Sequence, residues 1–146
     1  MNTAKPLNEP CASVEGVLAH EAFLRWPSIS HHIKTSLDSF DSGYSLEDLL
    51  TAIQLRQKQL WIINEGEAAA ITAIYNLPKW TKLVVEYLGG GNMPAWFPTW
   101  ADLMAEYAKF HHCKYIEVWG RKGWAKLAKS RGDRVETITM SRKFVL

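Results

Sequence analysis

The most informative segment of the sequence is VVEYLGGGN, residues 84–92. Its first five residues follow a strand pattern, and three glycines and an asparagine end it. Glycine lets backbone amides approach a ligand closely, and the start of a following helix offers unpaired N–H groups to an anion. This segment therefore either binds a diphosphate or forms only a sharp turn. The residues concerned are Gly89, Gly90, Gly91 and Asn92.

The chain after this stretch continues as helix, strand, helix and strand. Apolar residues recur at helical spacing from Trp96 to Ala108, and a short strand covers Tyr115–Trp119. A short helix around Leu127 and a last strand within residues 135–145 follow. Because a helix separates the strand Lys82–Leu88 from Tyr115–Trp119, we expect these two strands to be parallel neighbours.

Two more strands are predicted before this stretch. Leu60–Ile63 and Ala68–Tyr75 are short apolar runs, and the turn residues Asn64-Glu65-Gly66 separate them. Connections this short join antiparallel strands. We therefore expect these two runs and the strand Lys82–Leu88 to form a three-stranded meander.

Helical patterns precede the meander. One helix is expected over Val17–Leu24, broken or restarted at Pro27, and apolar residues then recur at helical spacing as far as Phe40. Ser45 starts a further helix, because its hydroxyl can cap free N–H groups. Asp48 lies three residues later and completes a weak capping box.

These elements predict one small α/β domain. The chain has 146 residues, of which 47% are apolar and 22% charged, as in ordinary globular proteins. Residues 1–14 have no periodicity and contain two prolines, so we expect an extended arm there and a single domain over residues 15–146. The expected sheet is mixed and mostly antiparallel, with one central parallel strand pair and flanking helices.

Charge and composition exclude several classes of partner. The net charge of +2 argues against nucleic acid and anionic membranes. Basic residues cluster from Arg121 and Lys122 onward, either as a solvated helix face or as part of an anion site. The consecutive residues His111, His112 and Cys113 rarely converge on one ion, so no metal site is expected. No signal pattern or membrane-length apolar run is present, and we expect a cytoplasmic protein.

The order of elements from residue 46 onward resembles the GNAT superfamily of N-acetyltransferases. In that family a strand leads into a glycine-bearing loop, which grips the coenzyme A diphosphate at a helix N-terminus. Residues 83–92 match that place, and residues 121–132 lie where a later family motif is found. The resemblance implies acetyl-CoA as the cofactor and a small-molecule or protein amine as the acceptor. Arg121 and Lys122 would then meet phosphates.

A narrower resemblance is to small GNAT-like proteins encoded by phages and prophages. It rests on Gln59-Leu60-Trp61, the small-residue strand Ala68–Thr72, the strand end Leu88-Gly89-Gly90 and residues 116–124, within roughly residues 26–132. This likeness implies a phage or host protein as an alternative partner. It also implies a location in the host cytoplasm or in the virion.

Amine acetylation needs a base for the amine, N–H groups that polarise the thioester, and an acid for the departing sulfur. Glu86 is the candidate base, unless it is only a solvent-facing strand residue. Tyr87 and Tyr115 are the candidate acids, unless they only cover the core. Glu117 either faces the cleft in which acetyl-CoA would bind or pairs with Arg121, and the pairing is the favoured interpretation.

Two functions remain open at this point. The family tyrosine that protonates the leaving thiolate falls at Ala128, and alanine cannot donate a proton. The chain is therefore either an N-acetyltransferase with an unidentified amine acceptor or a non-enzymatic phage virion or host-interaction protein on a degenerate GNAT scaffold. In the second case Trp96 and Trp100 are the expected exposed contact surface.

Overall fold

The described part of the chain forms a mixed five-stranded sheet, in the order β1-β2-β3-β4-β5. The computed structural model describes residues 12–40, 42–120 and 129. The strands are β1 (Val14–Val17), β2 (Gln59–Ile63), β3 (Ala68–Asn76), β4 (Thr81–Gly90) and β5 (Cys113–Val118). Strands β1 to β4 are antiparallel neighbours, whereas β4 and β5 are parallel. The predicted meander and parallel pair are confirmed.

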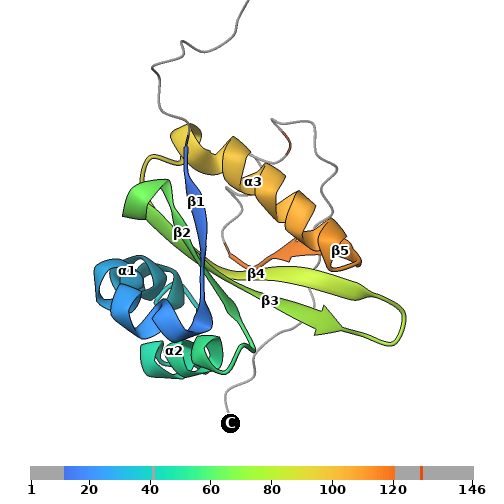
Figure 1. The fold of residues 1–146 in the computed structure, drawn as a ribbon, viewed down its shortest axis with the longest axis horizontal. Helices are drawn as coiled ribbons and strands as arrows, with labels where there is room; N and C mark the ends of the chain where they lie inside the picture. Colours follow the sequence, from blue (N-terminus) through green and yellow to red (C-terminus); the bar gives the residue numbers. More distant parts are fainter. Residues whose placement is uncertain (1–11, 41, 121–128, 130–146) are drawn as a thin grey trace, which may run out of the picture.

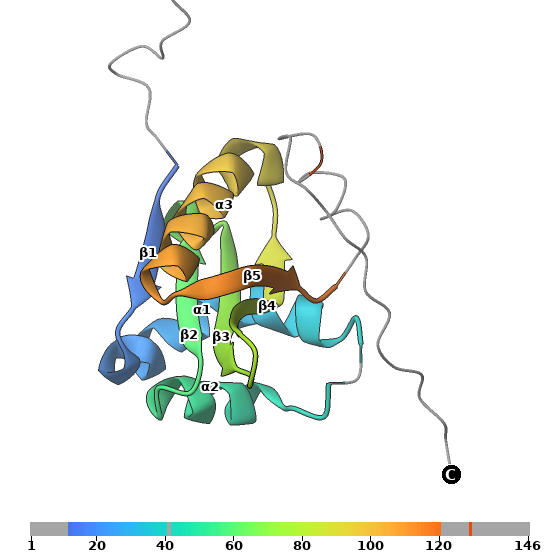
Figure 2. The same ribbon diagram turned by 90° about the vertical axis from the view of Figure 1, so that its right-hand side faces the viewer.

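Helices cover both faces of this sheet (Figures 1 and 2). Helices α1 (Ala22–Leu37) and α2 (Leu46–Gln54) pack on one face, and α3 (Met93–Phe110) crosses the other and connects β4 to β5. Two single turns of 3-10 helix are η1 (Ala19–Glu21) and η2 (Asn64–Gly66). None of the helices within the described ranges is long and apolar enough to span a bilayer.

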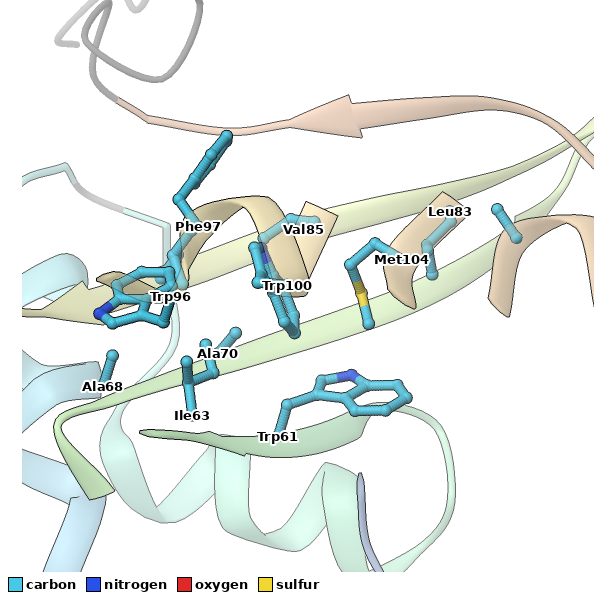
Figure 3. Packing of buried hydrophobic residues seen from close by; sticks show 12 residues of the cluster. Trp61, Ile63, Ala68, Ala70, Leu83, Val85, Trp96, Phe97, Trp100 and Met104 are labelled. Carbon is cyan, nitrogen blue, oxygen red and sulfur yellow. The ribbon is translucent and has the colours of Figure 1, made fainter. Parts of the chain in front are cut away.

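Tryptophans fill the core between α3 and the sheet (Figure 3). Trp96 is 0% exposed and Trp100 3%, and the Trp100 ring meets Trp61 of β2 edge to face at 6.0 Å. The indole N–H of Trp96 donates to the Gly91 carbonyl at 2.7 Å. The prediction that Trp96 and Trp100 form an exposed contact surface is therefore wrong. Both rings lie on the face of α3 that packs on the sheet. Burial there removes from water the apolar area that an exposed position would leave hydrated.

The start of the domain also differs from the prediction. Residues Val14–Val17 form β1 instead of leading into a helix, because they extend the sheet by pairing with β2, with Val14 opposite Ile63 and Val17 opposite Leu60. The sheet thus begins one residue before the predicted domain boundary. Helix α1 continues through Pro27 without a break. Proline removes one backbone donor there, and burial of the apolar face of α1 outweighs that loss.

The predicted start of α2 is confirmed. The Ser45 hydroxyl accepts from the Asp48 N–H at 3.1 Å, and the Asp48 carboxylate accepts from the Ser45 N–H at 2.8 Å. These reciprocal bonds complete the capping box. The predicted helix around Leu127, the predicted last strand, and the side chains of Arg121 and Lys122 lie outside the described residues.

Candidate functional site

The parallel strands β4 and β5 separate partway along β4. Their pairing runs from Thr81 opposite Cys113 to Val85 opposite Val118. The Trp119 N–H donates to the Val85 carbonyl at 2.9 Å, just past the end of β5. Strand β4 continues to Gly90, and within residues 12–40 and 42–120 this last part of β4 pairs with β3 alone. The centre of the sheet thus has one strand whose edge is released from its parallel neighbour.

A β-bulge lies at the point of separation. Tyr87 is opposite Ile71 and Val85 is opposite Thr72, so Glu86 is an extra residue in β4. Glu86 and Tyr87 therefore direct adjacent side chains to the same face of the sheet, the one covered by α1 and α2. Bulges of this kind re-aim side chains and are frequent beside active sites.

Glu86 is buried in a cluster of polar side chains on that face. Only 1% of the residue is exposed, and Lys58 Nζ lies 2.5 Å from its Oε1. The Tyr75 hydroxyl donates to Oε2, and the Tyr44 ring centroid lies 5.2 Å from Lys58 Nζ. We call Tyr44, Lys58, Tyr75 and Glu86 the Lys58–Glu86 cluster. Burial, and then the bond to the Glu86 carboxylate, raise the pKa of Tyr75, so its phenol stays a neutral donor.

The candidate acid Tyr87 is held by the core. Its hydroxyl donates to Ser42 Oγ at 2.7 Å, and its ring stacks on Phe40 at 5.8 Å between centroids. Burial is the main cause that raises the pKa of Tyr87 above its ordinary value. Tyr87 therefore lies on the same face as Glu86 but covers the core, the structural alternative that the sequence left open.

The candidate acid Tyr115 lies elsewhere. It is opposite Lys82 in the β4–β5 register, four positions before Glu86 along β4, which corresponds to about 13 Å of strand. Its side chain is 47% exposed and meets the Trp80 ring at 5.5 Å. The structure does not bring Tyr115 together with Glu86, because strand register places it toward the other end of the ladder.

Glu117 pairs with Lys82, and the expected partner Arg121 lies outside the described residues. Both carboxylate oxygens of Glu117 lie 3.3 Å from Lys82 Nζ, and the Trp119 indole N–H donates to Oε2 at 2.8 Å. The Trp119 ring lies 6.4 Å from the ring of Tyr75. The Lys82–Glu117 pair thus extends the set of polar side chains on this face from the Lys58–Glu86 cluster towards β5.

The glycines at the end of β4 have different roles. Gly89 and Gly90 pair with Ala69 and Ala68 within the ladder, so they belong to the strand and not to a loop. A Cβ on Gly89 would overlap the His32 carbonyl oxygen of α1. A Cβ on Gly90, whose φ is +136°, would overlap Ala68. Close packing therefore explains Gly89 and Gly90. Of the three glycines at the end of β4, Gly91 alone has room for a Cβ, which would meet nothing within 4 Å.

The start of α3 has one feature that favours anion binding and one that opposes it. Its N-cap Asn92 is left-handed, with φ 59°, and its side chain does not cap the helix. The Asn92 amide instead donates to Glu67 Oε1 at 3.3 Å, and the Gly91 N–H donates to the Glu67 carbonyl at 3.2 Å. The uncapped helix start favours a diphosphate. The Glu67 carboxylate opposes one by like charge.

Sequence reasoning did not find Lys58, Tyr75 or Tyr44 as members of the site. Tyr75 lies near the end of β3, a strand with a mostly apolar sequence, and Lys58 lies between α2 and β2. The one signal was a lysine directly before the buried strand β2, where a charge needs a partner. Within residues 12–40 and 42–120, no group of three or more His, Cys, Asp or Glu side chains could hold a metal ion.

Known proteins match this chain by structure. No family model and no curated protein matches its sequence. The aminoglycoside acetyltransferase meta-AAC0020 from an uncultured soil metagenomic sample, solved with sisomicin, matches with a TM-score of 0.69 and 8% identity, over 92% of this chain and 96% of that one. The ribosomal-protein-alanine N-acetyltransferase from Brucella melitensis biovar Abortus 2308 matches with a TM-score of 0.64 and 11% identity, over 92% and 100%.

A third matching structure contains acetyl-CoA. A predicted acetyltransferase from Clostridium acetobutylicum, solved with acetyl-CoA, matches with a TM-score of 0.62 and 14% identity, over 90% of this chain and 96% of that one. The fold of this chain is therefore the GNAT fold, as the sequence predicted. Identities this low establish the fold alone.

Proposed function

We propose that this chain is an acetyl-CoA-dependent N-acetyltransferase. The observation that carries the proposal is the separation of β4 from β5 at the Glu86 bulge. It leaves the middle of the sheet with an edge on which a thioester can lie. Three acetyltransferases share the fold over nearly their whole length, which supports the same chemistry here.

In this proposal acetyl-CoA would supply an activated acetyl group, and the start of α3 would hold its diphosphate. Gly91 has open space around it, and the helix start is free of a side-chain cap. Helix N-termini bind phosphates through their N–H groups and their dipole. Arg121 and Lys122 follow the end of β5 in the sequence and would add positive charge.

The released edge of β4 would polarise the thioester. The Leu88 N–H donates to the Ser36 hydroxyl of α1 at 3.3 Å, a long bond that a carbonyl oxygen can replace. Backbone donors fixed in this way stabilise the charge that develops on the oxygen during acyl transfer. Glu86 would accept the proton of the amine. Tyr87 and Tyr115 have no part in this version of the mechanism, and a water molecule protonates the sulfur.

The test is release of thiol from acetyl-CoA in the presence of a broad panel of amines and proteins. We expect turnover on at least one acceptor. Glu86→Gln should lower kcat/KM by about 10²–10⁴-fold, the usual contribution of a general base. Tyr115→Phe is the matched control and should leave turnover unchanged. Turnover that is the same in Glu86→Gln and the unaltered chain, with both shown to be folded, would remove Glu86 from the mechanism.

A second candidate is a non-enzymatic role on the same scaffold, as a phage virion or host-interaction protein. Two observations favour it. Both Glu86 oxygens already have partners, and the Glu67 carboxylate stands at the start of α3. This candidate predicts that coenzyme A gives no heat of binding and that the chain is found in purified phage particles by mass spectrometry. Saturable binding of coenzyme A would exclude it.

A further inference from the structure

A primary amine lies beside the point where β4 and β5 separate. Lys58 Nζ is 2.5 Å from Oε1 of Glu86, the first residue of β4 beyond the Val85–Trp119 hydrogen bond. The side chains of Lys58 and Glu86 are only 9% and 2% exposed. Lys58 thus has its amine beside Glu86, the residue that the proposed function assigns as the base for the acceptor amine.

The surroundings of Lys58 suit a nucleophile. An ammonium group must lose a proton before it can attack a thioester, and Glu86 Oε1 is within direct hydrogen-bond distance to receive it. The Tyr75 hydroxyl occupies the second Glu86 oxygen, which keeps Oε1 directed at Lys58.

We propose that Lys58 is itself an acetyl acceptor, modified by acetyl-CoA bound to the same chain; the inference rests on the proposed function. The Lys58 ammonium gives one proton to Glu86. The neutral nitrogen attacks the carbonyl carbon of the thioester, the new N–C bond forms, and the C–S bond breaks. The second proton leaves the nitrogen with the departing thiolate as free thiol. Glu86 then releases its proton to solvent, and an uncharged acetyl-lysine remains.

Other lysines provide an internal comparison. Lys34 pairs with Asp38 at 2.5 Å, but its side chain is 59% exposed, and the Lys109 side chain near Glu106 is 77% exposed. Lys34 and Lys109 are both open to any reagent in solution. A non-selective acetylating reagent should therefore modify them before the nearly buried Lys58.

The experiment compares two acetyl donors on the intact chain. One sample receives a trace of acetic anhydride and the other receives acetyl-CoA, and peptide mass spectrometry measures acetyl occupancy at each lysine. Acetic anhydride should label Lys34 and Lys109 ahead of Lys58. Acetyl-CoA should reverse that order, with a rate constant that does not change when the protein is diluted. The same order with both donors would overturn the proposal.

Variants of Glu86 and Lys58 test whether these two residues carry out the acetylation. Glu86→Gln should lose acetylation of Lys58 by acetyl-CoA and keep the background on Lys34. Lys58→Arg keeps the positive charge but removes the acceptor amine. Acetyl-CoA should then no longer modify position 58 ahead of Lys34 and Lys109. Because either change removes one partner of a buried pair and can unfold the chain, the comparison of the two acetyl donors on the unaltered protein decides the question without these variants.

Calorimetry separates this inference from the function on which it rests. Saturable binding of acetyl-CoA with Lys58 left unmodified would overturn acetylation of Lys58 and leave the proposed function intact. Absence of binding would overturn both. Binding together with selective modification of Lys58 is the expected result.

Discussion

Lys58 and Glu86 are 28 residues apart in the sequence, yet their side chains meet at 2.5 Å with almost no exposure to solvent. The pair connects the residue that leads into β2 with the bulge of β4. A buried ion pair is a costly way to stabilise a core, because both charges lose their hydration. Its place at the point where two strands separate is consistent with a role in the chemistry.

The first prediction concerns this pair. Lys58→Met should lower the free energy of unfolding by about 3–5 kcal/mol, because it leaves the Glu86 carboxylate buried without its cation. The double change Lys58→Met and Glu86→Leu should recover much of that loss. Urea melts of the single and double variants measure both values. A single variant as stable as the original chain would mean that Glu86 finds another partner or takes up a proton without cost.

The second prediction separates the glycines at the end of β4. Gly89→Ala should destabilise the chain by about 1–3 kcal/mol or more, because the added Cβ overlaps the His32 carbonyl of α1. Gly91→Ala is the matched control, since a Cβ there meets nothing within 4 Å. Thermal unfolding of the two variants should differ clearly. Equal stabilities would show that α1 lies farther from β4 than described.

The third prediction concerns the start of α2. Ser45→Ala should cost about 1 kcal/mol, because the Asp48 N–H loses the side-chain oxygen that caps it. Thr51→Ala, at an exposed position in the same helix, should not destabilise the chain. Denaturant melts give both values. No change at Ser45 would mean that water replaces the cap without loss.

The fourth prediction is a loss of stability at alkaline pH. The pKa values of Tyr75 and Tyr87 are raised from the ordinary value of 10.0, chiefly by burial. The folded chain therefore holds these protons more tightly than the unfolded chain. This contribution is complete below about pH 10 and disappears as the pH rises through the higher folded values. The midpoint of urea unfolding should fall as the pH rises above 10. Tyr75→Phe should make this fall with pH less steep.

The sequence predicts the parallel pair because the evidence for it is local. The glycine run at the end of β4 and the helical spacing of α3 are both readable along the chain, and connectivity then places β5 beside β4. Strand β1 was missed because a four-residue strand at Val14–Val17 shows no clear period of its own. Its pairing with β2, nearly fifty residues away, decides its conformation.

The site is harder to predict than the fold. Glu86 was identified from its place near the strand exit, but its partners Lys58 and Tyr75 come together through a bulge. A bulge is one extra residue in a strand, and an apolar run such as Lys82–Leu88 does not reveal where it falls. Trp96 was misplaced because an aromatic side chain suits an interface and a core equally well.

We propose that acetyl-CoA binds where β4 separates from β5, and isothermal calorimetry of acetyl-CoA added to the full chain measures that binding. We predict saturable heat with one site per chain, and a rise in melting temperature with acetyl-CoA concentration, because a ligand that binds only the folded state stabilises it. Absence of heat with acetyl-CoA in the millimolar range, and an unchanged melting temperature, would show that the chain does not bind acetyl-CoA at this site.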